Sequence, residues 1–234
     1  MLAAHLARPR SAKGKPVPGL VIAHRFPGGQ EGRQMSGRSF PELALAFPTQ
    51  AEGFFGWLRD LACATDVLRS VEDVHGVWMA GFGTGGALAI CAAAADPAVM
   101  GVAAVGAPTD FDDWASHPRR LPARARDPGI MAGGPPGGTY AQWARELPQT
   151  RAIACVEQLA PRPLLLLHGS DDEAVPVFDA RVLADAHGDA DLRIVEGGRH
   201  ALRHDPRAVA ILLGWLDRQR NQAAASRFSH PAGG

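Results

Sequence analysis

The sequence predicts an α/β fold with a mostly parallel sheet of about five to six strands and helices on both of its faces. Two patterns indicate this fold. Short apolar runs of strand length alternate along the chain with longer segments whose apolar residues recur at helical spacing. The runs are also continuous, which is typical of parallel strands that are buried on both faces by βαβ crossovers.

Five apolar runs are predicted to be strands. They are Gly19–His24, Gly76–Ala80, Gly101–Gly106, Pro163–His168 and Asp191–Val195. Each run is followed by a loop that contains glycine or charged residues. In a parallel sheet such loops gather at one edge, where the carboxyl ends of the strands meet and ligands usually bind. We therefore expect the functional residues in four of these loops, those after His24, Ala80, His168 and Val195.

The segments between the strands carry helix signals. The predicted helices are Ser39–Phe47, Phe54–Ser70, Ala87 to about Ala95, Phe178–Ala186 and Pro206 to about Arg218. The first and the last have a proline in the first turn, after the capping residues Ser39 and Asp205. The second is amphipathic, with apolar residues at helical spacing along one face.

The chain is predicted to form one domain of residues 19–219. Its 234 residues are enough to bury a sizeable core. Residues 1–18 are polar and basic, and we expect them to be loosely ordered. The polar residues 220–234 are predicted to form a flexible tail.

Residues from about 110 to 160 interrupt the alternation of strands and helices. The proline and glycine cluster Gly133–Gly138 separates two short predicted helices, Phe111–Ala115 and Tyr140–Leu147. This pattern predicts a small lid inserted into the domain. Its aromatic residues either line a substrate pocket or anchor the lid helices onto the core. They are Trp114, Tyr140 and Trp143.

Composition argues against several classes of protein. The 24 Lys and Arg residues balance 24 Asp and Glu residues, whereas nucleic-acid-binding proteins usually carry a basic excess. No apolar run approaches the roughly 18 residues of a membrane span. The cysteines Cys63, Cys91 and Cys155 have the spacing of neither a disulfide framework nor a metal knuckle, and no HExxH or HxExH pattern occurs. We expect a cytoplasmic protein without metal or other cofactor, and its oligomeric state stays open.

The loop after the second predicted strand, Gly81–Gly86, has two interpretations. Its sequence GFGTGG fits the dinucleotide-binding pattern G-x-G-x-x-G, through Gly81, Gly83 and Gly86. That pattern needs an acidic residue about 20 residues further on, whereas the first carboxylate after the next strand is Asp110, in a loop. The other interpretation is a strand–turn–helix nucleophile elbow, G-x-S-x-G, in which Gly83 occupies the serine position.

Three other loops complete the elbow pattern. They read His24-Arg25-Phe26-Pro27-Gly28, His168-Gly169-x-x-Asp172-x-x-Val175-Pro176 and Gly197-Gly198-Arg199-His200. Nucleophile position, acid and histidine follow one another in the order of α/β-hydrolases. Over roughly residues 19–218 the chain resembles the α/β-hydrolase superfamily, near its dienelactone hydrolase-like and bacterial esterase-like members. The resemblance implies an α/β-hydrolase-like sheet.

The resemblance also implies roles for individual residues. Asp172 would be the acid of the catalytic triad and His200 its base, with Asp171 and His204 as the neighbouring alternatives. Backbone N–H groups of Thr84 and of the Arg25–Phe26 segment would form the oxyanion hole. The Thr84 side chain would cap the helix that follows.

Three departures from the family pattern bear on function. Gly83 has no side chain that could attack a carbonyl group. Arg25 replaces the glycine that usually follows the histidine of the oxyanion loop. The strand that the family places between two early helices is missing around Ala46–Thr49.

These departures favour a serine-hydrolase homologue without its nucleophile, which binds a small apolar ester- or acyl-like ligand or a protein partner. Two alternatives stay open. In one, the Asp172–His200 pair activates water directly, as the general base of an esterase. In the other, the loop Gly81–Gly86 binds a dinucleotide.

Overall fold

The computed structural model describes residues 17–23, 53–117 and 140–228. These residues form one sheet of five parallel strands in the order β1-β2-β3-β4-β5. The strands are β1 (Val17–Ala23), β2 (Val74–Phe82), β3 (Val99–Val105), β4 (Leu164–Gly169) and β5 (Asp191–Val195). The predicted α/β fold and its parallel sheet are therefore confirmed.

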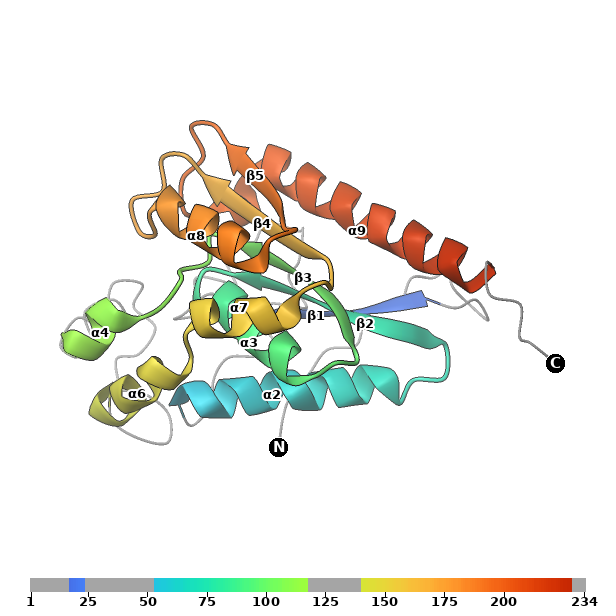
Figure 1. The fold of residues 1–234 in the computed structure, drawn as a ribbon, viewed down its shortest axis with the longest axis horizontal. Helices are drawn as coiled ribbons and strands as arrows, with labels where there is room; N and C mark the ends of the chain where they lie inside the picture. The colour runs from blue at the N-terminus through green and yellow to red at the C-terminus, as the bar shows by residue number, and fades with distance from the viewer. Residues whose placement is uncertain (1–16, 24–52, 118–139, 229–234) are drawn as a thin grey trace.

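Helices connect the strands and cover the sheet (Figure 1). The longer ones are α2 (Gly53–Arg69), α3 (Thr84–Ala95), α7 (Ala152–Leu159), α8 (Val177–His187) and α9 (Pro206–Phe228). Shorter elements are α4 (Asp112–Ser116), α6 (Tyr140–Glu146) and the 3-10 turns η2 (Leu147–Gln149) and η3 (Leu202–His204). The helix predicted at Ser39–Phe47 and the segment Ala46–Thr49, where we expected a strand to be missing, lie outside the described residues.

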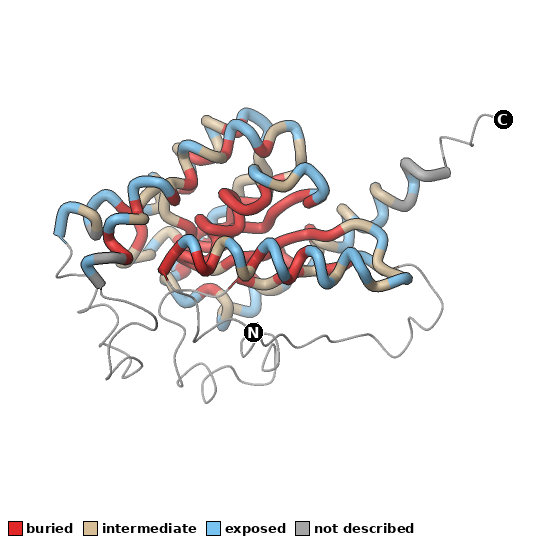
Figure 2. The backbone as a smooth tube through the Cα atoms, turned by 90° about the horizontal axis from the view of Figure 1, so that it is seen from below, coloured by how far each residue is buried: buried red, intermediate tan, exposed pale blue. Residues whose placement is uncertain are grey.

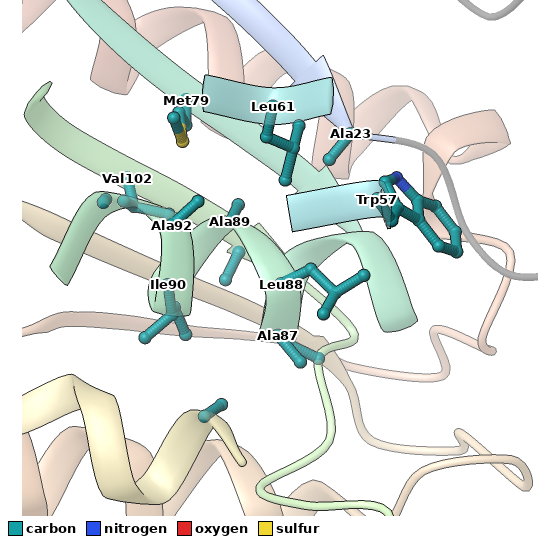
Figure 3. Packing of buried hydrophobic residues seen from close by; sticks show 14 of the residues in the cluster. Ala23, Trp57, Leu61, Met79, Ala87, Leu88, Ala89, Ile90, Ala92 and Val102 are labelled. Atoms are coloured by element: carbon teal, nitrogen blue, oxygen red, sulfur yellow. The ribbon is translucent and has the colours of Figure 1, made fainter. Parts of the chain in front are cut away.

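The larger hydrophobic core lies on one face of the sheet, beneath α2, α3, α7 and α8. It joins inward-facing strand residues such as Met79 and Val102 to Leu61 of α2 and Leu88 of α3, all of which are fully buried. Figure 3 shows these side chains around α3. Burial of this apolar surface is the main force that holds the helical layer on the sheet.

Helix α3 runs through the centre of this layer. Every residue from Thr84 to Ala93 is buried, and Figure 2 shows that the buried stretches of the backbone gather in the interior of the molecule. Alanine and glycine make up most of the helix, so the helix can lie close to β2, β3 and α7 at once.

Helix α9 covers the opposite face of the sheet. Its Ala208, Leu212 and Trp215 form a second core with the buried strand residues on that face of the sheet. The rings of Trp215 and of Trp78 on β2 meet edge to face, with centroids 5.7 Å apart. Helices on both faces were expected from the buried strands, and both faces are covered.

The carboxyl-terminal part of the expected insertion belongs to the core. Trp143 and Leu147 are buried in the larger cluster, together with Ala152, Val156 and Leu159 of α7. Helix α7 packs against α3 and α8, because its apolar side chains recur at positions i, i+4 and i+7. The sequence prediction that an insertion extends to about residue 160 stays a prediction, and α7 within that range packs into the core of the domain.

The last helix is longer than predicted. It continues to Phe228 instead of ending near Arg218, so the expected flexible tail from residue 220 begins as helix. The segment Asn221–Ala225 is polar, which suggested a tail, but it contains Gln222 and a run of alanines. These residues have high helix propensity, and helix continues through them without burial of an apolar face.

Candidate active site

Four loops meet at the carboxyl edge of the sheet. Gly83 follows β2, Gly106 follows β3, Asp172 follows β4 and His200 follows β5. All five strands are parallel and neighbours in the sheet follow the chain order. The loops therefore lie side by side. Those after β2, β4 and β5 were predicted from the sequence and the loop after β3 was not, while the predicted loop after β1 lies outside the described residues.

Gly83 forms the turn between β2 and α3. Strand β2 pairs with β3 as far as Phe82, and the helix begins at Thr84, so one residue makes the whole turn. Gly83 has φ 55° and ψ −124°, and its N–H donates a hydrogen bond to the Val105 carbonyl at 2.8 Å. This backbone region is strained for residues with a side chain, and glycine adopts it at little cost.

The flanking glycines allow strand and helix to approach each other. A Cβ atom on Gly81 would overlap the Gly85 carbonyl, and one on Gly86 would lie 2.9 Å from the Ala107 Cβ. The glycine pattern is thus explained by a sharp strand–turn–helix connection. The dinucleotide-binding alternative finds no support in this geometry.

The predicted role of Thr84 as helix cap is wrong. Gly83 is the N-cap of α3, and Thr84 is the first helical residue, with a side chain that is only 5% exposed. The single-residue turn leaves no room for a further capping position. The backbone N–H of Thr84 stands at the amino end of a helix, where N–H groups are free of intrahelical partners and favour negative charge.

Asp172 and His200 form a hydrogen-bonded pair. The His200 Nδ1 atom lies 2.8 Å from the Asp172 Oδ2 atom, and the N–H groups of Ala174 and Val175 donate to Oδ1, each at 2.9 Å. The Asp172 side chain is fully buried, while that of His200 is 25% exposed. A carboxylate only accepts, so Nδ1 carries the proton and Nε2 keeps its lone pair, as a general base requires.

The surroundings of Asp172 keep its carboxyl group ionised. Burial raises the pKa, but the hydrogen bond from His200 and the N–H groups of Val175 and Ala174 lower it further than burial raises it. The net pKa lies below the ordinary value of 3.8. Asp172 is therefore a carboxylate at neutral pH and can stabilise a positive charge on His200.

Of the two adjacent aspartates, the structure assigns the partner of His200 to Asp172. Asp171 is exposed, and its Oδ1 accepts a hydrogen bond from the Ser170 hydroxyl at 2.7 Å. His204, the alternative to His200, is exposed in the turn η3.

Hydrogen bonds and a close main-chain contact join the loop that contains Asp172 to the loop that contains His200. The Gly197 N–H donates to the Ser170 Oγ at 2.8 Å, and the Asp171 N–H donates to the Gly198 carbonyl at 2.9 Å. A Cβ atom on Gly169 would overlap the Gly198 carbonyl, so the two loops touch through their main chains. This contact sets the distance between Asp172 and His200.

The structure describes some of the other predicted site residues. Arg25 and Phe26 lie outside the described residues. Trp114 belongs to α4 and Tyr140 begins α6. The Trp143 ring is buried in the core and meets Phe54 edge to face at 5.6 Å. Trp143 therefore packs α6 against the core, and its place in a substrate pocket stays a prediction.

Three residues near the pair had no role in the sequence prediction. Gly106 has φ 59°, and a Cβ there would lie 3.5 Å from Asp172 Oδ2 and 3.6 Å from His200 Nδ1. Ser170 ties the two loops together, and His168 is buried beside Asp172, with 3.4 Å between Nε2 and Oδ2. His168 and Ser170 were visible in the motif around Asp172, but which atoms they face depends on the folded loop.

No three His, Cys, Asp or Glu side chains are grouped so as to hold a metal ion, as far as the chain is described. Among the helices of residues 53–117 and 140–228, none has both the length and the apolar character that crossing a membrane requires.

No protein-family model matches the chain, but solved structures resemble it. Est1E from Butyrivibrio proteoclasticus is 20% identical, with a TM-score of 0.63 over 88% of this chain and 89% of that one. The α/β-hydrolase GrgF from Penicillium sp. sh18 is 15% identical, with a TM-score of 0.66 over 89% and 91%. An esterase domain from Rhodothermus marinus is 23% identical, with a TM-score of 0.58 over 88% of both chains. These likenesses show that the chain has the α/β-hydrolase fold.

The conformation of Gly83 predicts a measurable cost for any side chain there. We expect Gly83→Ala to lower the free energy of unfolding by about 1–3 kcal/mol, because alanine is strained at positive φ. Gly214, inside α9, is the matched control. A Cβ there meets nothing closer than 3.7 Å, so Gly214→Ala should raise stability by about 0.5–1 kcal/mol. Urea unfolding measures both, and equal effects would contradict the assignment of strain to Gly83.

The lowered pKa of Asp172 predicts how stability depends on pH. A depressed folded-state pKa stabilises the fold above the ordinary value of 3.8, and that contribution is lost as the pH falls through the folded pKa. Asp172→Asn removes the ionisation. We expect the free energy of unfolding to fall less steeply in this variant than in the wild type between about pH 6 and pH 3. Identical slopes in urea unfolding would show that Asp172 does not contribute.

Proposed function

We propose that this protein is a serine-hydrolase homologue without its nucleophile, which binds a small acyl- or ester-like ligand and forms no acyl-enzyme. The observation that carries the proposal is Gly83. It makes a one-residue strand–turn–helix connection at positive φ, which is what the G-x-S-x-G pattern requires of a nucleophile elbow, and it has no oxygen or sulfur atom that could attack a carbonyl carbon.

The neighbouring Thr84 does not supply the missing nucleophile. Its side chain is buried and its backbone is already helical, so its hydroxyl is not presented at the sharp turn. Other groups that a hydrolytic site would use lie in the loops beside this turn. They are the hydrogen-bonded pair Asp172–His200 and the amino end of α3, which favours a partially negative oxygen.

A carbonyl-containing ligand fits this arrangement. The Thr84 N–H at the start of α3 can donate to a carbonyl oxygen, and His200 can donate or accept at Nε2. The chain carries no net charge, which suits a ligand that is largely apolar. Among the structural neighbours, Est1E has been solved with ferulic acid, a small aromatic acid.

A second candidate function is hydrolysis by general base catalysis. The intact Asp172–His200 hydrogen bond of 2.8 Å favours it. His200 Nε2 would take a proton from water while the water oxygen attacks the ester carbonyl carbon. The Thr84 N–H would stabilise the resulting oxyanion, which collapses as the alcohol leaves with the proton from His200. Sites that lack a triad member retain a rate about 10³–10⁴ above water in well-studied hydrolases.

Covalent labelling tests the first proposal. Wild-type protein should form no adduct with a fluorophosphonate, whereas Gly83→Ser should form a stoichiometric adduct, visible by intact mass. His200→Ala in the Gly83→Ser background should abolish it, since the new serine then lacks its base. Circular dichroism confirms that each variant is folded. A stoichiometric adduct on the wild type would overturn the proposal, and so would a folded Gly83→Ser that stays unlabelled.

Ester hydrolysis separates the two candidates. If His200 activates water, wild type should hydrolyse short p-nitrophenyl esters about 10²–10⁴-fold faster than His200→Ala. His204→Ala is the matched control, because it removes an exposed histidine from the same segment. Equal rates for all three proteins would rule out the general base. A rise in melting temperature with a short acyl amide, which these proteins cannot turn over quickly, would then still report binding.

A further inference from the structure

We propose that His168 is a positioning residue that holds the acid loop, residues 170–176, so that Asp172 stays aligned with His200. The inference takes the Asp172–His200 pair as the working part of the proposed site. It does not depend on whether that site binds or hydrolyses its ligand.

His168 is a polar residue at the end of an otherwise apolar strand. Leu164 and Leu166 of β4 point into the larger core, while Leu165 and Leu167 point to the side of α9. Alternation along the strand places His168 on the same face as Leu164 and Leu166. Only 1% of it is exposed, so its ring nitrogens need partners within the protein.

The partner of His168 lies in the acid loop. Its Nε2 is 2.9 Å from the Val175 carbonyl oxygen. A carbonyl can only accept, so the proton is on Nε2 and the imidazole donates it. The same nitrogen is 3.4 Å from Asp172 Oδ2. The donated proton thus also faces the carboxylate oxygen that accepts from His200.

These contacts hold both main-chain polar groups of Val175. Asp172 Oδ1 accepts the Val175 N–H at 2.9 Å, and His168 donates to the Val175 carbonyl. The loop is therefore held on both sides, once by the acid itself and once by the strand from which the loop leaves. Asp172 Oδ2 is left to face His200 Nδ1 at 2.8 Å.

Loss of the His168 donor would remove the hydrogen bond to the Val175 carbonyl oxygen. The Val175 residue is buried, so its carbonyl oxygen would lose a partner that water does not readily replace. The loop would then shift to satisfy that oxygen, and Asp172 would move with it. Because hydrogen bonds are directional, a small displacement of Oδ2 weakens the bond to His200.

His187 provides a matched control within the same fold. It is also buried, at 5% exposed, and its Nε2 lies 3.1 Å from a backbone carbonyl, that of Arg162. Arg162 precedes β4, so this contact is at the opposite end of the strand from the acid loop. Both histidines secure a backbone carbonyl, but only His168 secures one next to Asp172.

Proton NMR in water tests the proposal without a substrate. The His200 Nδ1 proton, bonded to a carboxylate, should give a downfield resonance that disappears in His200→Ala. We expect it to be lost or shifted in His168→Leu and retained in His168→Gln, whose amide N–H reaches the position of Nε2. His187→Leu should retain it even though it also loses a buried hydrogen bond. If His168→Leu does not fold, His168→Asn replaces it, because its shorter amide cannot reach Val175.

Labelling adds a functional measurement. In the Gly83→Ser background, His168→Leu should slow fluorophosphonate labelling at least about tenfold, whereas His168→Gln and His187→Leu stay within about twofold. An unchanged His200 resonance in His168→Leu, or its equal loss in His187→Leu, would overturn the positioning role. Failure of Gly83→Ser to be labelled would count against the proposed function alone, because the NMR result decides the role of His168 by itself.

Discussion

A buried carboxylate needs hydrogen-bond donors, and the arrangement of the loops after β4 and β5 depends on the way in which Asp172 meets this need. Two backbone N–H groups occupy Oδ1, and the imidazole of His200 occupies Oδ2. The donors outweigh burial, so the pKa of the carboxyl group stays below its ordinary value. Removing one donor would leave charge without compensation in the interior, which is far more costly than losing a surface ion pair. The loops after β4 and β5 are thereby fixed relative to each other.

Glycines make the close approach of these loops possible. Gly169 meets the backbone of Gly198, Gly81 meets that of Gly85, and Gly106 leaves space beside Asp172 and His200. At Gly169 and Gly81 a side chain would separate elements that must touch, whereas at Gly106 it is the positive φ of 59° that favours glycine. The carboxyl edge of the sheet is thus held by main-chain contacts as well as by the apolar core beneath it.

Gly83 differs from these glycines. The surroundings of Gly81, Gly106 and Gly169 explain why those positions lack a side chain. A nucleophile elbow, by contrast, normally carries a reactive side chain in spite of the strain at that position. Glycine relaxes the backbone at this turn and offers no side chain for attack on a carbonyl group. In the proposed function, the Asp172–His200 pair would then serve binding, or slow activation of water.

The amino-acid sequence was enough to predict the order of strands and helices, the parallel sheet and the absence of a side chain at position 83. These features depend on local patterns, namely apolar periodicity, glycine at turns and the order of motifs along the chain. Only the tertiary structure distinguished Asp172 from Asp171, since two adjacent carboxylates look alike until the loop decides which one is buried. It also placed Trp143 and α7 in the core, and His168 against the acid loop. Burial and hydrogen-bond direction depend on contacts between residues far apart in the chain, and no local pattern records them.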